Sequence, residues 1–199
     1  METIRGRTSY ELNFNWLAER LADYNHLLLD LGTGDGRFVC RMAEQHKEAF
    51  FIGVDACREN LRASSRSKLP NALFIIASAQ ALPQELNGLI SHVTINFPWG
   101  SLLESLLSGE PALMNGLSSI SCLNAGIEIH LNGGALAEAG TTLETGAEKI
   151  YHNMLRSGWQ VSAPVAMNAS ALRNFPSTWA KRLAFGRDPR AMTMSGCFK

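Results

Sequence analysis

A run of glycines after a buried strand constrains the fold of this chain more than any other feature. Residues 27–30, Leu-Leu-Leu-Asp, form the short continuous apolar run that is typical of a strand buried on both faces of a sheet. Gly32, Gly34 and Gly36 follow at intervals of two, before a helix predicted over residues 38–45. Glycines let the backbone turn sharply and approach a ligand closely. The order strand, glycine turn, helix therefore predicts an α/β protein with a ligand at this turn.

Buried strands and helices alternate along the rest of the chain. Further strands are expected at residues 50–55, 73–76, 92–96, 126–131, 159–163 and 192–198, and helices at residues 59–67 and 142–156. This alternation predicts a parallel sheet covered by helices on both faces.

The two ends of the chain carry extensions to this pattern. One domain over residues 1–199 is expected, with an N-terminal β-hairpin in residues 1–12 and a linker between the last two strands in residues 165–191. Asn13 is expected to cap a helix that runs to residue 21. The glycine-rich segment 133–140 is expected to be a loop.

The composition limits the possible partners. Lys plus Arg and Asp plus Glu both number 18, so the formal net charge is zero. An RNA-binding surface would have to be a local concentration of basic residues. The cysteines form no CxxC pair, so we expect free thiols and no metal site. No apolar run approaches the roughly 20 residues of a membrane span, and no signal peptide precedes the domain, so we expect a cytoplasmic protein without membrane contact.

Two further segments complete a predicted cofactor site beside the glycine turn. Asp55 ends the second buried strand, about 25 residues after Asp30. An acidic residue roughly 20 residues beyond such a turn commonly accepts hydrogen bonds from ribose hydroxyls. Residues 77–83 follow the third strand at the same sheet edge. The spacing of the glycines differs from the GxGxxG pattern of dinucleotide-binding folds.

A candidate acceptor site follows the fourth strand, in the run Asn96-Phe97-Pro98-Trp99-Gly100-Ser101. A strand-ending proline and a large aromatic residue fit poorly in a central strand, but an aromatic at this edge can stack on a flipped base. A second aromatic, Trp179, lies within one helical turn of Lys181 and Arg182, as a nucleic-acid surface needs. An amphipathic helix with Trp179 in the core explains that segment equally well.

Together these stretches resemble class I S-adenosylmethionine-dependent methyltransferases. Within that class they resemble the aminoglycoside-resistance enzymes that modify N1 of adenine 1408 in 16S rRNA, the kanamycin–apramycin resistance group. The matching stretches are Asp30–Arg37, Phe51–Leu61, Phe74–Leu86, Phe97–Leu103 and Trp179–Arg187. The resemblance implies a Rossmann-like, mostly parallel seven-stranded sheet, S-adenosylmethionine as methyl donor, and a monomer that acts on the 30S subunit.

The resemblance also implies roles for individual residues. Trp99 and Trp179 would sandwich the flipped adenine, next to Pro98. The cofactor would contact Asp30, Gly32, Thr33, Gly34, Gly36, Asp55, Ala79, Gln80, Leu82, Ser101 and Ser177. RNA would contact Arg62, Arg66, Lys68, Lys181, Arg182, Arg187 and Arg190. The chain departs from the family where Gln80 replaces a frequent acidic residue, and where arginines replace lysines in the linker after the second strand.

The chemistry of adenine N1 places few demands on the protein. Its lone pair is free at neutral pH and can attack a sulfonium methyl group directly, so no general base is needed, and the sequence offers no obvious one. Three alternatives remain open at this stage. They are a transfer-RNA guanine-N7 methyltransferase, which normally carries an extra Asp-Pro after the fourth strand, a small-molecule methyltransferase, and a non-catalytic cofactor or RNA binder.

Overall fold

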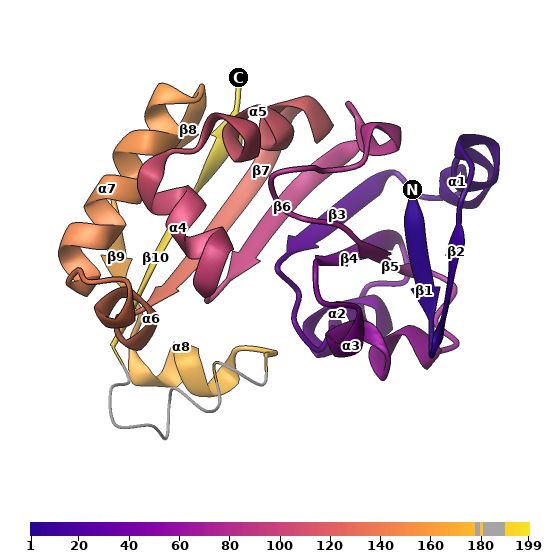
Figure 1. Ribbon diagram of the computed structural model, residues 1–199, viewed down its shortest axis with the longest axis horizontal. Helices are drawn as coiled ribbons and strands as arrows, with labels where there is room; N and C mark the ends of the chain where they lie inside the picture. Colours follow the sequence, from indigo (N-terminus) through magenta and orange to yellow (C-terminus); the bar gives the residue numbers. More distant parts are fainter. Residues whose placement is uncertain (178–179, 181–189) are drawn as a thin grey trace.

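One continuous β-sheet runs through the part of the chain that the structure describes, residues 1–177, 180 and 190–199 (Figure 1). In this computed structural model the strands lie side by side in the order β2 (Thr8–Glu11), β1 (Glu2–Arg5), β5 (Ala72–Ile76), β4 (Ala49–Asp55), β3 (His26–Leu31), β6 (Ile90–Asn96), β7 (Ser121–Asn132), β10 (Ala191–Phe198) and β8 (Trp159–Val161), and β9 (Val165–Ala166) pairs with β10.

The centre of the sheet is parallel. Strands β3 to β7 run in one direction, and β10 lies antiparallel between β7 and β8. In their order across the sheet, the seven strands β5, β4, β3, β6, β7, β10 and β8 form the predicted seven-stranded, mostly parallel sheet, which is thereby confirmed. The predicted N-terminal hairpin is also present and extends the sheet, because β1 pairs with β5 through Thr3 and Ile75.

Helices cover both faces of the sheet. The apolar core of one face contains residues of α1 (Phe14–Leu21), α4 (Gly100–Ser108), α5 (Pro111–Ile120), α6 (Gly133–Glu138) and α7 (Leu143–Arg156). The other face packs against α2 (Arg37–Gln45) and α3 (Arg58–Leu61). Strand β4 serves both cores, since Phe50 belongs to the first and Phe51 to the second. Within the described residues, no helix has the length and apolar character needed to cross a bilayer.

Two predicted elements differ in the structure. The helix predicted over 59–67 ends at Leu61, and a 3₁₀ turn follows at Ser64–Arg66. The serine hydroxyls explain the break, because Ser64 donates to the carbonyl of Asp35 and Ser65 accepts from the amide of Gly6. The loop predicted over 133–140 is wrong, since α6 forms there and the side chain of Asn132 caps it by accepting from Ala135 N.

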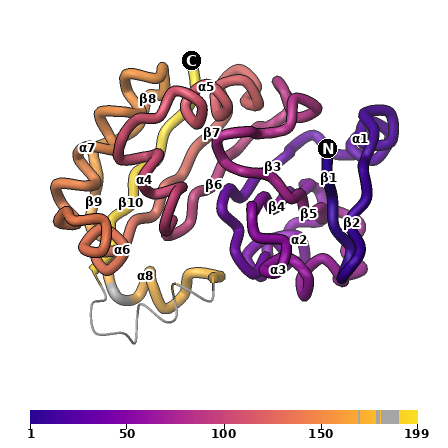
Figure 2. The backbone as a smooth tube through the Cα atoms, in the orientation of Figure 1, coloured from indigo at the N-terminus to yellow at the C-terminus, as the bar shows by residue number. Residues whose placement is uncertain are grey.

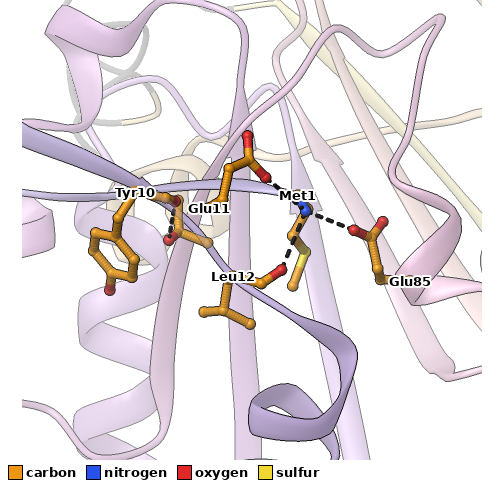
Figure 3. A network of polar contacts seen from close by, with 6 residues as sticks. Met1, Tyr10, Glu11, Leu12 and Glu85 are labelled. Carbon is orange, nitrogen blue, oxygen red and sulfur yellow. Dashed lines mark hydrogen bonds and ion pairs between the residues drawn. The ribbon is translucent and has the colours of Figure 1, made fainter.

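The N-terminus fastens the hairpin to the loop after β5 (Figure 3). The ammonium nitrogen of Met1 lies 2.5 Å from Glu85 Oε1 and 3.2 Å from Glu11 Oε2. It also donates a hydrogen bond of 3.2 Å to the carbonyl of Leu12. The hydrogen bond from this ammonium lowers the pKa of Glu85. These contacts hold both strands of the hairpin at the sheet edge.

The segment before β10 packs at the carboxyl edge of the sheet. Helix α8 (Ala169–Asn174) lies at the lower end of the trace in Figure 2. Its Leu172 is fully buried in a small cluster with Phe97, which follows β6. The ring of Phe175 lies 5.4 Å from that of Phe97 and stacks on Phe38 of α2 at 5.8 Å. This packing brings residues 167–177 next to the candidate site.

Candidate functional site

A cavity of about 500 Å³ opens at the carboxyl edge of the parallel strands. Its walls are the glycine turn after β3, the end of β4, the loop after β5, and the segment between β6 and α4. Ligands of open parallel sheets bind at this edge, and this volume is typical of a small-molecule site. The predicted site residues that line it are Gly32, Gly34, Asp55, Ala79, Gln80, Pro98, Trp99 and Ser101.

The glycine turn is built for close approach. Gly32, Gly34 and Gly36 all have positive φ, between 56° and 72°, a region that favours glycine. A Cβ at Gly32 would lie 2.6 Å from Leu102, and one at Gly36 would lie 2.5 Å from Phe74. Gly34 has no atom within 4 Å of such a Cβ. Gly32 and Gly36 therefore permit tight packing of the turn, while Gly34 leaves open space on the cavity side.

Asp55 is held firmly at the cavity wall. Its Oδ2 accepts a hydrogen bond of 2.8 Å from Gly34 N, and its Oδ1 accepts from Cys57 N at 2.8 Å and from Asn60 Nδ2 at 3.3 Å. The carboxylate is thus tied to the glycine turn and to α3 at once. It retains lone pairs that can accept hydroxyl hydrogens from a ligand.

The loop after β5 forms another wall. Gln80 donates from Nε2 to Ser105 Oγ at 2.7 Å and accepts from the hydroxyl of Ser78. These contacts fix the Gln80 amide beside α4. Leu82 does not line the cavity, because it packs in the core near Gly116 of α5.

The predicted acceptor motif has an unusual backbone. Phe97 has φ of +54°, which is uncommon for a bulky residue and marks local strain. Its amide donates a 2.8 Å hydrogen bond to the carbonyl of His130, and its ring is buried. Trp99 occupies the residue just before α4 and lines the cavity with 45% of its surface exposed. The turn therefore buries one aromatic ring and presents the next one at the cavity.

A buried polar chain supports this motif from below. Asn96 donates from Nδ2 to Asp30 Oδ1 at 2.8 Å, and Thr94 donates to the same oxygen at 2.9 Å. The Oδ1 of Asn96 lies 3.0 Å from His130 Nδ1. Burial raises the pKa of Asp30 to about 6 and lowers the pKa of His130 to about 4, so the histidine is neutral at pH 7. Neutral His130 then donates to Asn96, which fixes the direction of the chain of hydrogen bonds.

Several predicted cofactor residues lie outside the cavity. Asp30 is buried beneath the turn, and Gly36 packs against Phe74. Thr33 and Ser177 meet behind the turn in a small separate space that Asp30 also lines. Ser177 accepts a 3.3 Å hydrogen bond from the amide of Ala180. These four residues therefore shape the turn and its surroundings rather than the cavity wall.

None of the predicted RNA residues that the structure describes lines the cavity. Arg62 pairs with Glu59 at 2.8 Å, and the side chain of Arg66 packs beside Gly6. Lys68 and Arg190 are exposed. Trp179, Lys181, Arg182 and Arg187 lie outside the described residues.

The sequence reasoning missed two polar residues of the site, Asn60, which lines the cavity, and His130, which supports Asn96. Ser78 and Asn96, which lie in the predicted cofactor and acceptor segments, also line the cavity. His130 had no visible signal in the sequence, because only the pairing of β6 with β7 brings it to Asn96. Within the described residues, no cluster of three His, Cys, Asp or Glu side chains could hold a metal ion.

One family model and a relative of the same description match nearly the whole chain. The sequence model of the family described as 16S rRNA (adenine(1408)-N(1))-methyltransferase matches residues 2–198. A relative of that name from Escherichia coli is 28% identical over 214 aligned positions, which cover 98% of each chain.

Solved structures show the same fold. The aminoglycoside resistance methyltransferase NpmB1 is 29% identical, with a TM-score of 0.82 over the full length of both chains. A variant of the 16S rRNA (adenine(1408)-N(1))-methyltransferase from Catenulisporales acidiphilia, solved with its cosubstrate SAM, has a TM-score of 0.86 at 24% identity and covers 100% of this chain and 96% of its own.

Proposed function

The chain belongs to the 16S rRNA (adenine(1408)-N(1))-methyltransferase family, and on this premise we propose that it methylates N1 of that adenine in the assembled 30S subunit. The methyl donor is S-adenosylmethionine, and the modification gives resistance to aminoglycosides. The observation that carries the proposal is the family match over residues 2–198 in a chain whose glycine turn, Asp55 and Trp99 line one cavity. We place the enzyme in the cytoplasm, because its substrate is ribosomal, and we propose that it acts as a monomer, as the family resemblance implies.

The cavity fits the methyl donor. Asp55 offers an oriented carboxylate to ribose hydroxyls, and Gly34 leaves open space for the methionine part. The loop with Ala79 and Gln80 is the wall available to an adenine ring. When bound there, S-adenosylmethionine supplies a methyl group on a positively charged sulfur.

The lining of the cavity suits a reaction without a general base. Asp55 is the one titratable side chain among the described residues that line it, and three donors already hold that carboxylate. Adenine N1 needs no base, because its lone pair carries no proton at neutral pH. The protein's task is to hold N1 in line with the methyl–sulfur bond and to exclude water.

We assign the positioning of the base to the acceptor motif. Trp99 would stack on the flipped adenine, and Pro98 would border its edge, with Trp179 on the opposite face of the ring. Methylation leaves a positive charge on the base, and each indole face can stabilise that charge by about 0.5–2 kcal/mol. Support for this role comes from the exposure of Trp99 at the cavity and from the strained turn at Phe97 that presents it.

Docking on the ribosome would use the basic residues outside the cavity. We expect the surface residues Arg62, Arg66, Lys68 and Arg190 to contact phosphates together with Lys181, Arg182 and Arg187. Phosphate contacts position a protein on RNA without reading its sequence.

Labelled-methyl transfer to isolated 30S subunits tests the proposal. We expect one methyl group per subunit, located at adenine 1408 by a stop in reverse transcription, because an N1 methyl group blocks the base-pairing edge. Trp99→Ala is the matched variant, and it should transfer little label. Expression in a susceptible bacterium should raise the inhibitory concentrations of kanamycin and apramycin.

The alternatives predict different products. A transfer-RNA guanine-N7 enzyme would label transfer RNA and leave 30S subunits unlabelled, and a cofactor or RNA binder would label neither. Either result would contradict the proposal. The family match over nearly the whole chain favours the ribosomal substrate.

A further inference from the structure

A second cleft, of about 320 Å³, lies under the N-terminal hairpin. It is bounded by β1, α1, the start of β5 and the linker that joins β4 to β5. Arg5, Arg20 and Lys68 line it together with Tyr10 and Ser67, and none of its described lining residues is acidic. We call this site the hairpin cleft.

Among the described residues, no ion pair involves the three cations of the hairpin cleft, Arg5, Arg20 and Lys68. Arg20 is held in place, because it donates to the carbonyl of Pro70 at 3.0 Å and lies 5.0 Å from the ring centre of Trp16. A guanidinium that is held in place without an acidic partner favours an anionic ligand.

The surface around the cleft is basic although the whole chain is neutral. The hairpin, residues 2–11, and residues 58–70 contain the basic residues Arg5, Arg7, Arg58, Arg62, Arg66 and Lys68, and the acidic residues Glu2, Glu11 and Glu59. This concentration is a third of the 18 Lys and Arg residues of the chain. A local excess of this size attracts a polyanion even when the net charge is zero.

Hydrogen bonds join the two basic segments into one surface. Arg58 donates from Nη2 to the carbonyl of Arg7 at 2.7 Å, and Gly6 N donates to Ser65 Oγ at 2.9 Å. Figure 1 shows the turn of the hairpin beside α3 at one end of the molecule. The hairpin is therefore a fixed wall of the cleft, and it places Arg5 in the same lining as Lys68.

The hairpin cleft lies near the methyl-transfer site. The hydroxyl of Ser64 donates to the carbonyl of Asp35 in the glycine turn. Lys68 lies four residues after Ser64 in the chain. A chain spans at most roughly 3.6 Å per residue, so the Cα atoms of Ser64 and Lys68 lie within about 15 Å of each other. A nucleic acid whose base enters the cavity can reach the cleft with its backbone.

We propose that the hairpin cleft binds a backbone phosphate of the ribosomal RNA, with Arg5, Arg20 and Lys68 as its ligands. The proposal rests on the proposed function for the identity of the RNA. It adds the hairpin and α1 to the docking surface, and it makes the hairpin a part of substrate binding as well as a sheet extension.

The test compares paired variants of the full chain for binding to isolated 30S subunits over a series of salt concentrations. The double variant Arg5→Gln with Lys68→Gln removes two charges, and Arg5→Lys with Lys68→Arg keeps both. Arg156→Gln, an exposed residue at the end of α7, is the control for a general loss of charge. Arg20 is left intact because it packs against Trp16 and Phe50.

Each lost phosphate contact lowers the magnitude of the slope of log affinity against log salt concentration by roughly 0.7–0.9. The Gln pair loses one phosphate contact, so we expect it to lower the slope by roughly 0.7–0.9 and the affinity at 0.1 M salt by roughly fivefold to eightfold. Affinity for S-adenosylmethionine and Tm should stay unchanged. The Lys/Arg pair should retain the wild-type slope.

Two results would overturn the proposal. One is a wild-type slope in the Gln pair, and the other is an equal loss of slope in Arg156→Gln. If the wild type binds 30S subunits with the expected differences among variants but does not methylate them, the proposed function is wrong and the hairpin cleft stands.

Discussion

At the scale of single residues, Asp55 connects the glycine turn to the cofactor. Its carboxylate is oriented by Gly34 and Asn60 and faces the cavity. Hydrogen bonds to a charged group are worth about 1.5–3 kcal/mol, so Asp55→Ala should weaken S-adenosylmethionine binding roughly tenfold to a hundredfold. Calorimetry on both proteins measures this. Equal affinities would remove Asp55 from the ribose site.

Trp99 should act on the RNA base and little on stability. Base–aromatic stacking is worth about 1–3 kcal/mol, so Trp99→Ala should slow methyl transfer roughly tenfold to a hundredfold. Trp99→Phe keeps an aromatic face and should retain more activity. With 45% of its surface exposed, Trp99 contributes little to the core, and Tm should change slightly. A large loss of Tm with full activity in the folded fraction would contradict the stacking role, and the same pair of measurements applies to Trp179→Ala.

Asp30 and His130 should give opposite pH dependences of stability. Burial raises the pKa of Asp30 from 3.8 to about 6. The contribution of Asp30 to the free energy of unfolding is therefore present below pH 4 and is lost as pH rises to 6. Burial lowers the pKa of His130 from 6.5 to about 4. The contribution of His130 to the free energy of unfolding is therefore present above pH 6.5 and is lost as pH falls to 4. Each amounts to about 3 kcal/mol, and in the wild type they largely cancel.

Removing either Asp30 or His130 should reveal the pH dependence of stability that the other residue causes. Relative to the wild type, Asp30→Asn should leave a free energy of unfolding that rises between pH 4 and 6.5. His130→Gln should leave one that falls between pH 4 and 6. Urea unfolding at a series of pH values checks both, and parallel profiles in all three proteins would show that these pKa shifts are absent.

At the scale of elements, the antiparallel strand β10 depends on one glycine. Gly196 pairs with Val161 of β8, and a Cβ there would lie 1.9 Å from the carbonyl oxygen of Gln160. Gly196→Ala must push β8 away, at a cost of about 3 kcal/mol, which lowers Tm by roughly 6–12 °C in a domain of this size. The exposed neighbour Ser195→Ala is the control for thermal unfolding. An unchanged Tm in Gly196→Ala would show that the strands can separate freely.

The elements that differ from the sequence prediction share one cause. Serine hydroxyls end α3 early by bonding to the glycine turn and to the hairpin, and Asn132 starts α6 by capping it. In each case a side-chain hydrogen bond to the backbone decided the local structure. Hydrophobic periodicity does not report such bonds.

At the scale of the whole molecule, zero net charge limits general attraction to RNA. The basic residues cluster at the hairpin and the linker after β4, which suits docking on a shaped surface. We therefore expect efficient methylation of assembled 30S subunits and little methylation of naked 16S rRNA. Initial rates on both substrates at equal concentration test this. Comparable rates would show that the RNA sequence alone suffices.

The sequence by itself determined the parallel sheet, the glycine turn and the meeting of Gly34, Asp55 and Trp99. These follow from local patterns, because parallel strands all end at one edge of the sheet and bring the residues that follow them together. The tertiary structure alone decided that Asp30 is buried beneath the turn, that His130 supports Asn96, and that Arg5 and Lys68 line one cleft. Those contacts join residues more than 30 positions apart through strand pairing and burial, and no spacing along the chain encodes such distances.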